Sequence, residues 1–167
     1  SKEYSLGKLT TEEYIRDPRF EVIGVAVKIN NQQTEWASGT HEELKQYLQT
    51  FDWEKAMVLA HNTMFDGAIL SWIFNINPRV YTDTLCISRG VNGVENSSSL
   101  KALSEKYDIG AKGTEVIQAI GKNRKDFTQS ELEKYGDYCI NDVDLTYKLF
   151  YIMGNEFPKK EFKLIDA

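Results

Sequence analysis

Two aspartates and a tyrosine are the residues of this chain whose types and spacing are best suited to chemistry. Asp142 lies inside the apolar stripe of a predicted long helix, where burying an ionised carboxylate is costly without a cation or hydrogen-bond donors. Tyr138 precedes it by four residues, so both side chains project from the same side of that helix. Asp66 directly follows a predicted buried strand and begins another helix, and ligands usually bind at such strand ends.

These residue types suit a hard divalent cation. Asp66 and Asp142 each lie at the edge of a buried apolar element and could bind such a cation through oxygen. Two cations about 4 Å apart can clamp the attacking and leaving oxygens of a phosphodiester, and the Tyr138 hydroxyl could orient water beside them. Structural interpretations also stand: Asp142 as a hydrogen-bonded carboxylate, Asp66 at the positive end of a helix dipole, Asn62 as a helix cap and Phe65 as core.

The elements that must position these residues follow from local patterns. Thr128 and Glu131 have the spacing of a capping box, which predicts a helix over about 129–155 that carries the tyrosine and the second aspartate. The apolar run 56–60 predicts a buried strand that leads into the first aspartate. Strands therefore precede helices along most of the chain, which is typical of a mixed α/β domain. The other expected elements are strands at 20–29, 34–38 and 80–82 and helices that begin after residues 10, 40, 62, 83 and 99.

Length and composition fit one globular domain over residues 1–167, since 41% of the residues are hydrophobic. The net charge of -5 is unlike that of a protein that binds nucleic acid mainly through a basic surface, although a nuclease site must itself be acidic to hold cations. Cys86 and Cys139 lie far apart in predicted helices, which fits neither a disulfide framework nor a zinc site and favours a reducing compartment. No apolar run reaches membrane-spanning length, so we expect no membrane partner.

Several motifs together resemble the 3'-5' exonuclease domains of phage and bacterial family A DNA polymerases. Asn62-x-x-Phe65-Asp66 resembles the second exonuclease motif of this family, and Tyr138-x-x-x-Asp142 resembles the third. Residues 12–23, 81–85 and 99–107 resemble connecting segments in the same order, and 158–167 resembles the start of a linker toward a polymerase domain. The resemblance therefore spans nearly the whole chain.

The resemblance implies a ribonuclease H-like α/β fold, in which a five-stranded sheet is flanked by helices. It also implies proofreading: hydrolysis of single-stranded DNA 3' ends by two Mg²⁺ or Mn²⁺ ions, beside a polymerase domain in cis, in the cytoplasm of a bacterium or phage-infected cell. Carried onto this chain, Asp66 and Asp142 would bind the metal ions, and Tyr138 would orient the attacking water. Asn62 and Phe65 would bind the terminal nucleotides.

One element of the family is missing from this sequence. The family's first motif, Asp-x-Glu on the first strand, supplies two further carboxylates, but no Asp-x-Glu precedes the strand that begins at Phe20, and Glu3 has no Asp two residues before it. We therefore expect a chain without its first strand, with unpaired backbone at the sheet and without catalytic activity by itself. Two alternatives stay open: a non-catalytic domain that binds single-stranded nucleic acid, and a related 3'-5' exoribonuclease.

Overall fold

The computed structural model describes residues 4–113 and 121–156 of the chain. Strands and helices alternate along most of it, which confirms the predicted α/β class. A five-residue π-helix, η2 (Ile69–Ile73), continues the third helix, and two short 3-10 helices are η1 (Trp53–Lys55) and η3 (Arg124–Asp126). The strands are β1 (Gly24–Val27), β2 (Glu35–Ser38), β3 (Met57–Ala60) and β4 (Val80–Asp83), and the helices are α1 (Thr11–Arg16), α2 (His41–Leu48), α3 (Thr63–Ala68), α4 (Thr84–Asn92), α5 (Leu100–Lys106) and α7 (Gln129–Gly154).

Three helices, α1, α2 and α7, begin at a threonine whose hydroxyl accepts a hydrogen bond from the backbone N–H three residues later. In each case the carboxylate of a glutamate at that third position accepts a hydrogen bond from the backbone N–H of the threonine. Each box therefore satisfies two N–H groups that the first helical turn leaves without partners. The pairs are Thr10 with Glu13, Thr40 with Glu43 and Thr128 with Glu131.

β1 and β2 form an antiparallel hairpin that runs from the pair Gly24–Ser38 to the pair Val27–Glu35. The strand predicted over 20–29 is shorter than expected because β2 ends at Ser38. Thr40 already caps α2, so no backbone is available to pair with the residues before Gly24. The second strand lies within its predicted range of 34–38.

β3 and β4 form a separate parallel pair, with Met57 opposite Val80 and Ala60 opposite Asp83. Within residues 4–113 and 121–156 the strands therefore make two two-stranded sheets, and the single five-stranded sheet that the resemblance implies is not found there. The physical reason is that no strand in these ranges lies between the two pairs to carry hydrogen bonds to both.

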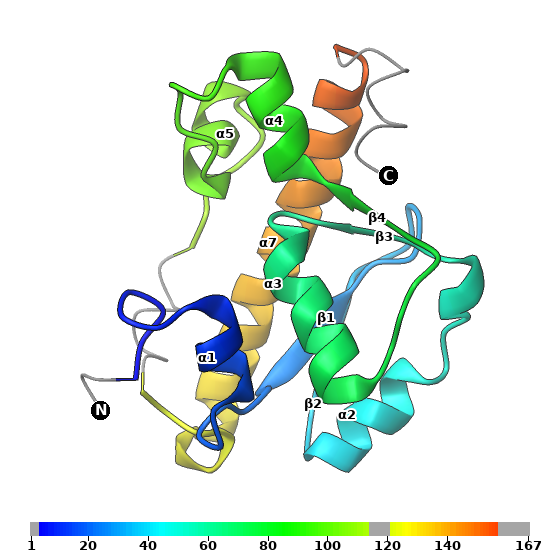
Figure 1. Cartoon of the computed structure of the whole chain (residues 1–167), viewed down its shortest axis with the longest axis vertical. Helices are drawn as coiled ribbons and strands as arrows, with labels where there is room; N and C mark the ends of the chain where they lie inside the picture. Colours follow the sequence, from blue (N-terminus) through cyan, green and yellow to red (C-terminus); the bar gives the residue numbers. More distant parts are fainter. Residues whose placement is uncertain (1–3, 114–120, 157–167) are drawn as a thin grey trace.

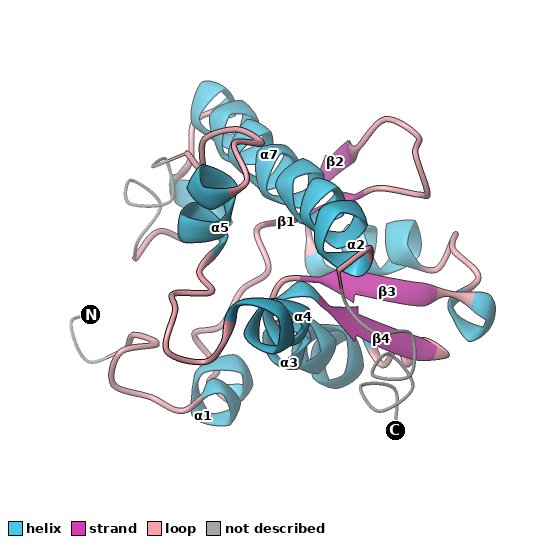
Figure 2. Ribbon diagram, turned by 90° about the horizontal axis from the view of Figure 1, so that it is seen from above, coloured by secondary structure: helices cyan, strands magenta, loops and turns pink. Residues whose placement is uncertain are grey.

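Helix α7 links the two sheets, because it contacts β1, β2 and β3 as well as α4 and α5 (Figure 1). Figure 2 shows that α7 and α3 lie on opposite sides of β3. The indole of Trp36 on β2 fits between the hairpin and α7 because both neighbours are glycines: a Cβ on Gly24 or Gly136 would lie 2.3 or 2.6 Å from its ring atoms. The Thr34 hydroxyl also donates to Asp144 of α7 at 2.5 Å. These contacts fix the position of the helix that carries Tyr138.

The core is divided between the two ends of the molecule. Leu145, Leu149 and Met153 of α7 pack with apolar residues of α4 and α5, while Leu44 and Leu48 of α2 pack with a second cluster near the π-helix. Burying each such side chain stabilises the fold by about 1.5–3 kcal/mol. The C-terminal half of α7 is thus anchored in the first cluster.

Three further sequence predictions can be placed. Cys86 and Cys139 are free thiols on helices α4 and α7, as expected. None of the helices in the described ranges is long and apolar enough to cross a membrane. Glu3 and the predicted linker over 158–167 lie outside the described residues.

Candidate active site

The turn between β3 and α3 is held by Asp83, a buried carboxylate at the end of the neighbouring strand β4. Asp83 is 6% exposed and accepts hydrogen bonds from the backbone N–H groups of Asn62 at 2.8 Å, Thr63 at 3.1 Å and Leu85 at 2.9 Å. The sequence predicted Asp83 as the cap of α4. Its carboxylate also fixes the start of α3, so it positions both helices at once.

Asn62 occupies the tightest point of this turn, with φ 76° and ψ 65°. This left-handed conformation is unfavourable for most residues but is tolerated by asparagine. The Asn62 side chain is exposed and makes no capping hydrogen bond, so its interpretation as a side-chain helix cap is not supported. Its amide can therefore both donate to and accept from a ligand.

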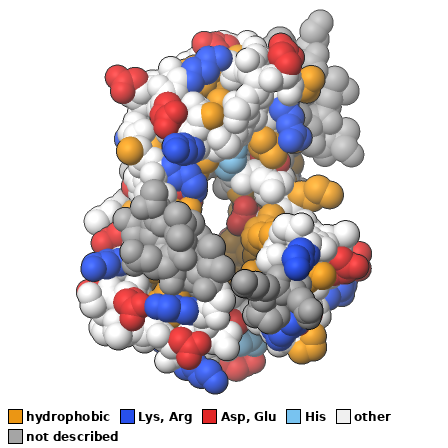
Figure 3. Space-filling model, turned by 90° about the vertical axis from the view of Figure 1, so that its left-hand side faces the viewer, with side chains coloured by type: hydrophobic (Ala, Val, Ile, Leu, Met, Phe, Trp, Pro, Cys, Tyr) orange, Lys and Arg blue, Asp and Glu red, His pale blue; other side chains and the backbone are white. Residues whose placement is uncertain are grey.

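Asp66 lies in the first turn of α3 and is exposed, yet it is surrounded by enough protein to perturb its ionisation. Burial raises the pKa of Asp66 to about 6, and the nearby charge of Asp83 adds to this effect. The charge of Asp66 in turn helps to raise the pKa of Tyr81 on β4, after burial of that phenol. A carboxylate that is both accessible and partly desolvated is typical of a concave surface. Figure 3 shows that one face of the molecule is hollowed and that an acidic side chain lies beside the hollow.

Asp142 on α7 is paired with Lys112, a residue that no sequence pattern singled out. Lys112 Nζ donates to Asp142 Oδ2 at 2.7 Å, and each side chain is 26% exposed. Asp142 Oδ1 is buried and has no hydrogen-bond partner within the described part of the chain. A buried acceptor without a partner costs about 1–3 kcal/mol, so this oxygen is available to a cation or a donor.

Tyr138 lies one turn before Asp142 and is 9% exposed. Its ring stacks on that of Tyr135, with centroids 6.2 Å apart, and Lys112 Nζ lies 4.8 Å from the Tyr138 centroid. Burial raises the pKa of Tyr138 despite the opposing effect of Lys112, so the phenol is protonated at neutral pH and can donate a hydrogen bond. Tyr138 and Asp142 of α7 therefore form one cluster with Lys112, which lies beside the helix.

His61 directly follows strand β3 and precedes Asn62. Both of its ring nitrogens are hydrogen-bonded, one to the Thr84 hydroxyl and one to the carbonyl of Ser98, each at 2.8 Å, so the ring is held in place by the protein. Burial lowers the pKa of His61, and the charges of Asp83, Lys112 and Asp142 all act on it. His61 is thus within electrostatic reach of Asp83 at the end of β4 and of Asp142 on α7.

Tyr14 of α1 makes a second connection that the sequence did not reveal. Its ring centroid lies 6.5 Å from that of Phe65 and 4.6 Å from that of Tyr4, which stacks on it. Tyr14 also contributes to raising the pKa of Tyr135, mainly raised by burial. Tyr14 therefore contacts Phe65 of α3 and is within electrostatic reach of Tyr135 on α7.

The predicted site residues thus fall into two groups. Asn62, Phe65 and Asp66 lie at the start of α3, and Tyr138 and Asp142 share one face of α7. Across residues 4–113 and 121–156, no hydrogen bond or ion pair joins the two groups directly. No set of three His, Cys, Asp or Glu residues in this part of the chain is arranged to hold a metal ion.

The one Asp-x-Glu in the sequence, Asp52 to Glu54, does not complete the site. It lies at η1, immediately before β3, whereas Asn62 and Asp66 follow the same strand. Four extended residues separate the two ends by about 13 Å. Asp52 is instead paired with Lys55 at the surface.

The described α/β fold thus places one carboxylate, Asp66, in the first turn of α3 after strand β3 and another, Asp142, on helix α7. A family model for 3'-5' exonuclease matches residues 11–158, which is well over half of the chain. The chain therefore belongs to the 3'-5' exonuclease domain family of family A DNA polymerases, and its fold is consistent with the ribonuclease H-like fold of these domains. Members of this family generally depend on divalent metal ions. No significant match to the chain was found among curated proteins or among solved structures.

Proposed function

We propose that this chain is a proofreading-type exonuclease domain that acts on single-stranded DNA 3' ends, beside a polymerase domain in cis. The observation that carries the proposal is Asp142, whose buried Oδ1 has no partner and which lies beside a protonated tyrosine in a chain of the 3'-5' exonuclease family. A buried carboxylate oxygen without a donor favours a cationic ligand.

Asp66 and Asp142 would hold the divalent ions, either Mg²⁺ or Mn²⁺. Both offer the carboxylate oxygens that these ions prefer, and both retain oxygens that no described donor occupies. A bound ion would polarise the phosphodiester and lower the pKa of water. With a pKa of about 6, Asp66 is largely ionised at neutral pH and remains a competent ligand.

The other site residues would orient the reacting groups. The Tyr138 hydroxyl donates a hydrogen bond to the attacking water and fixes its lone pair toward the phosphorus. The exposed amide of Asn62 hydrogen-bonds the terminal nucleotide, and the Phe65 ring, backed by Tyr14, offers a face for its base. These roles require both groups of site residues to face one substrate.

We further propose that these 167 residues do not turn over DNA by themselves. The resemblance implies four carboxylates, and this chain supplies two of them in the matching motifs, one of which is engaged by Lys112. The same observation favours the second candidate function, a domain that binds single-stranded 3' ends without cleaving them. A related exoribonuclease would differ from the first candidate in its substrate, and from the second also in cleaving it.

Matched DNA and RNA oligonucleotides, each labelled at the 5' end, test the proposal in the presence of Mn²⁺. We expect the chain to bind single-stranded DNA, and to lose that binding in Asn62→Ala and Phe65→Ala but not in Asn31→Ala, an exposed asparagine of the β1–β2 turn. Cleavage at an ordinary exonuclease rate would refute the proposed inactivity. Tighter binding or cleavage of RNA would favour the exoribonuclease, and failure to bind either oligonucleotide would refute the function.

A further inference from the structure

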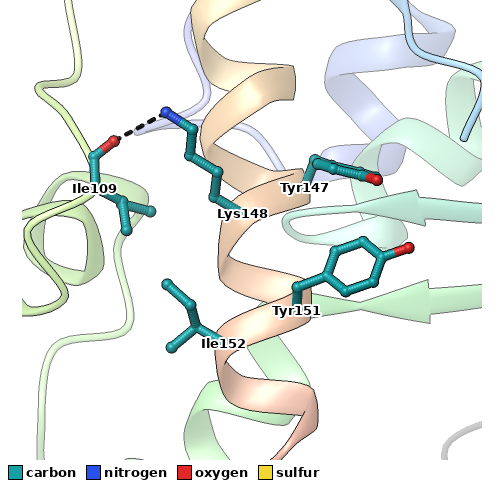
Figure 4. A pocket seen from close by; sticks show the side chains of 5 residues that line it. All are labelled: Ile109, Tyr147, Lys148, Tyr151 and Ile152. Carbon is teal, nitrogen blue, oxygen red and sulfur yellow. Dashed lines mark hydrogen bonds between the residues drawn. The ribbon is translucent and has the colours of Figure 1, made fainter. Parts of the chain in front are cut away.

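The segment that carries Lys112 is fastened along α7. At its start, Lys148 Nζ donates to the carbonyl of Ile109 at 3.3 Å, as Figure 4 shows. Two residues later, Asn141 Nδ2 donates to the carbonyl of Ala111 at 2.9 Å. The backbone of this segment therefore follows the helix, and the Lys112 side chain is brought to α7 by two hydrogen bonds that precede it.

Gly110 lets the segment lie this close. Its φ of +141° is one that residues with a side chain rarely adopt, and a Cβ at this position would be 3.1 Å from Leu145 Cδ2. Leu145 is itself 1% exposed and belongs to the core, so it cannot easily move away. The placement of Lys112 is thus built into the backbone and does not depend on the flexible side chain alone.

The charge of Lys112 faces Asp142 and Tyr138. Burial acts to lower the pKa of Lys112, but its hydrogen bonds to these two groups raise the pKa overall, so the ammonium is charged at neutral pH. The ion pair engages only Oδ2 of the aspartate, and Oδ1 stays buried and without a partner in the described part of the chain. A positive charge therefore already lies at the carboxylate that is the candidate metal ligand.

We propose that Lys112 is an internal counter-cation that holds Asp142 in the absence of a divalent ion and competes with that ion for the carboxylate. The inference rests on the proposed function, in which Asp142 is a metal ligand. The positive charge of Lys112 stabilises the metal-free protein, because it neutralises the half-buried carboxylate of Asp142. The same charge weakens metal binding, because Oδ2 must be released and the ammonium repels the incoming ion. Lys112 is thus a positioning residue that sets the metal affinity of the site.

Three substitutions separate competition from a merely structural role. Lys112→Gln removes the charge but can still donate a hydrogen bond, and Lys112→Arg keeps the charge. Lys148→Gln is the matched control, since it also removes one lysine charge, here from α7 where Lys148 contacts the carbonyl of Ile109, away from Asp142. For each variant we would measure the dissociation constant for Mn²⁺ by electron paramagnetic resonance and the melting temperature in EDTA and in Mn²⁺.

We expect Lys112→Gln to melt at a lower temperature than the wild type in EDTA but to bind Mn²⁺ about tenfold more tightly. Lys148→Gln should leave Mn²⁺ affinity unchanged. Lys112→Arg should bind Mn²⁺ no more tightly than the wild type, because its planar fork can engage the carboxylate with two bonds. Tighter binding by the arginine variant would overturn the proposal by itself, even if the glutamine variant failed to fold.

Asp142→Asn distinguishes failure of this inference from failure of the proposed function. If Asp142→Asn abolishes Mn²⁺ binding while Lys112→Gln binds like the wild type, the competition is wrong and the metal-ligand assignment stands. If Asp142→Asn leaves Mn²⁺ binding unchanged, the assignment of Asp142 is wrong and both proposals fall. If no variant binds Mn²⁺, the competition is likewise refuted.

Discussion

The start of α3 and helix α7 each contribute one aspartate to the candidate site, and the two carboxylates lie in opposite electrostatic environments. Asp66 is exposed, yet burial by the surrounding protein raises its pKa to about 6, and the nearby charge of Asp83 adds to this effect. Asp142 is 26% exposed and forms an ion pair with Lys112. The protein therefore disfavours the ionised form of Asp66, whereas Lys112 neutralises the charge of Asp142 before any metal ion binds.

In the proposed site, the exposed carboxylate of Asp66 forms an open half, and the carboxylate of Asp142, already paired with Lys112, forms a guarded half. The open half is held by backbone hydrogen bonds to Asp83, so its geometry does not depend on the charge of Asp66. The guarded half depends on an ion pair between segments far apart in the sequence. Removing charge from the two halves should therefore have opposite effects on stability.

The largest expected effect on stability comes from Asp83→Ala, which would remove the hydrogen bonds that hold the open half in place. Three backbone N–H groups lose their buried acceptor, and we expect the free energy of unfolding to fall by about 3–5 kcal/mol. Urea denaturation measures the change. Asp52→Ala, which removes an exposed surface pair, should change it by less than about 0.5 kcal/mol. A loss below about 1 kcal/mol in Asp83→Ala would show that water replaces the carboxylate.

The next effect tests the guarded half. Asp142→Asn leaves the Lys112 ammonium half-buried without its counter-charge, so we expect a loss of about 1–2 kcal/mol in EDTA, between the values for surface and buried pairs. Chemical denaturation at pH 7 measures it. An Asp142→Asn variant as stable as the wild type would mean that the ion pair does not neutralise the site.

The opposite sign is expected for Asp66→Asn. The raised pKa means that ionisation of Asp66 destabilises the folded state above pH 6, while below pH 3.8 both folded and unfolded states are protonated. The variant should therefore melt at a higher temperature than the wild type at pH 7 in EDTA, and this gain should disappear as the pH falls from 6 toward 3.8. A lower melting temperature at pH 7 would remove the contrast between the two aspartates.

The smallest expected effect on stability comes from Glu131, whose pKa is shifted in the opposite direction to that of Asp66. Hydrogen bonds from Lys122 and from the capping threonine, Thr128, lower the pKa of Glu131 to about 2. Its stabilising contribution is present above pH 4.5 and is lost as the pH falls toward 2. Glu131→Gln should thus be slightly less stable than the wild type at pH 6, and the two melting curves should converge between pH 4.5 and 2. A constant difference across this range would contradict the assignment.

Local patterns predicted the helix starts well because each capping box is contained within four residues. Thr128 and Glu131 alone place the start of α7, and the apolar periodicity carries it to its end. The strand over 20–29 was predicted too long because its extent depends on where its partner ends, which is set by the cap of α2. The length of a paired strand depends on both partners, so it could not be predicted from the sequence of one strand alone.

The candidate site could be predicted only in part for a related reason. The motifs identified Asn62, Phe65, Asp66, Tyr138 and Asp142, but the partners that give these residues their character are distant in sequence. Lys112 is 30 residues from Asp142, and its short glycine-flanked segment has no pattern of its own. The need for a counter-cation followed from burial of the carboxylate, whereas its identity required the folded chain.

The central claim is that Asp66 and Asp142 face one cation pocket, and anomalous scattering from Mn²⁺ in crystals of this chain tests it most directly. The account predicts a peak that lies about 2.0–2.3 Å from an oxygen of Asp142 or Asp66, with the other carboxylate reaching it directly or through one bound water. Peaks confined to other acidic side chains would contradict the claim. So would carboxylates placed too far apart to share ions separated by about 4 Å.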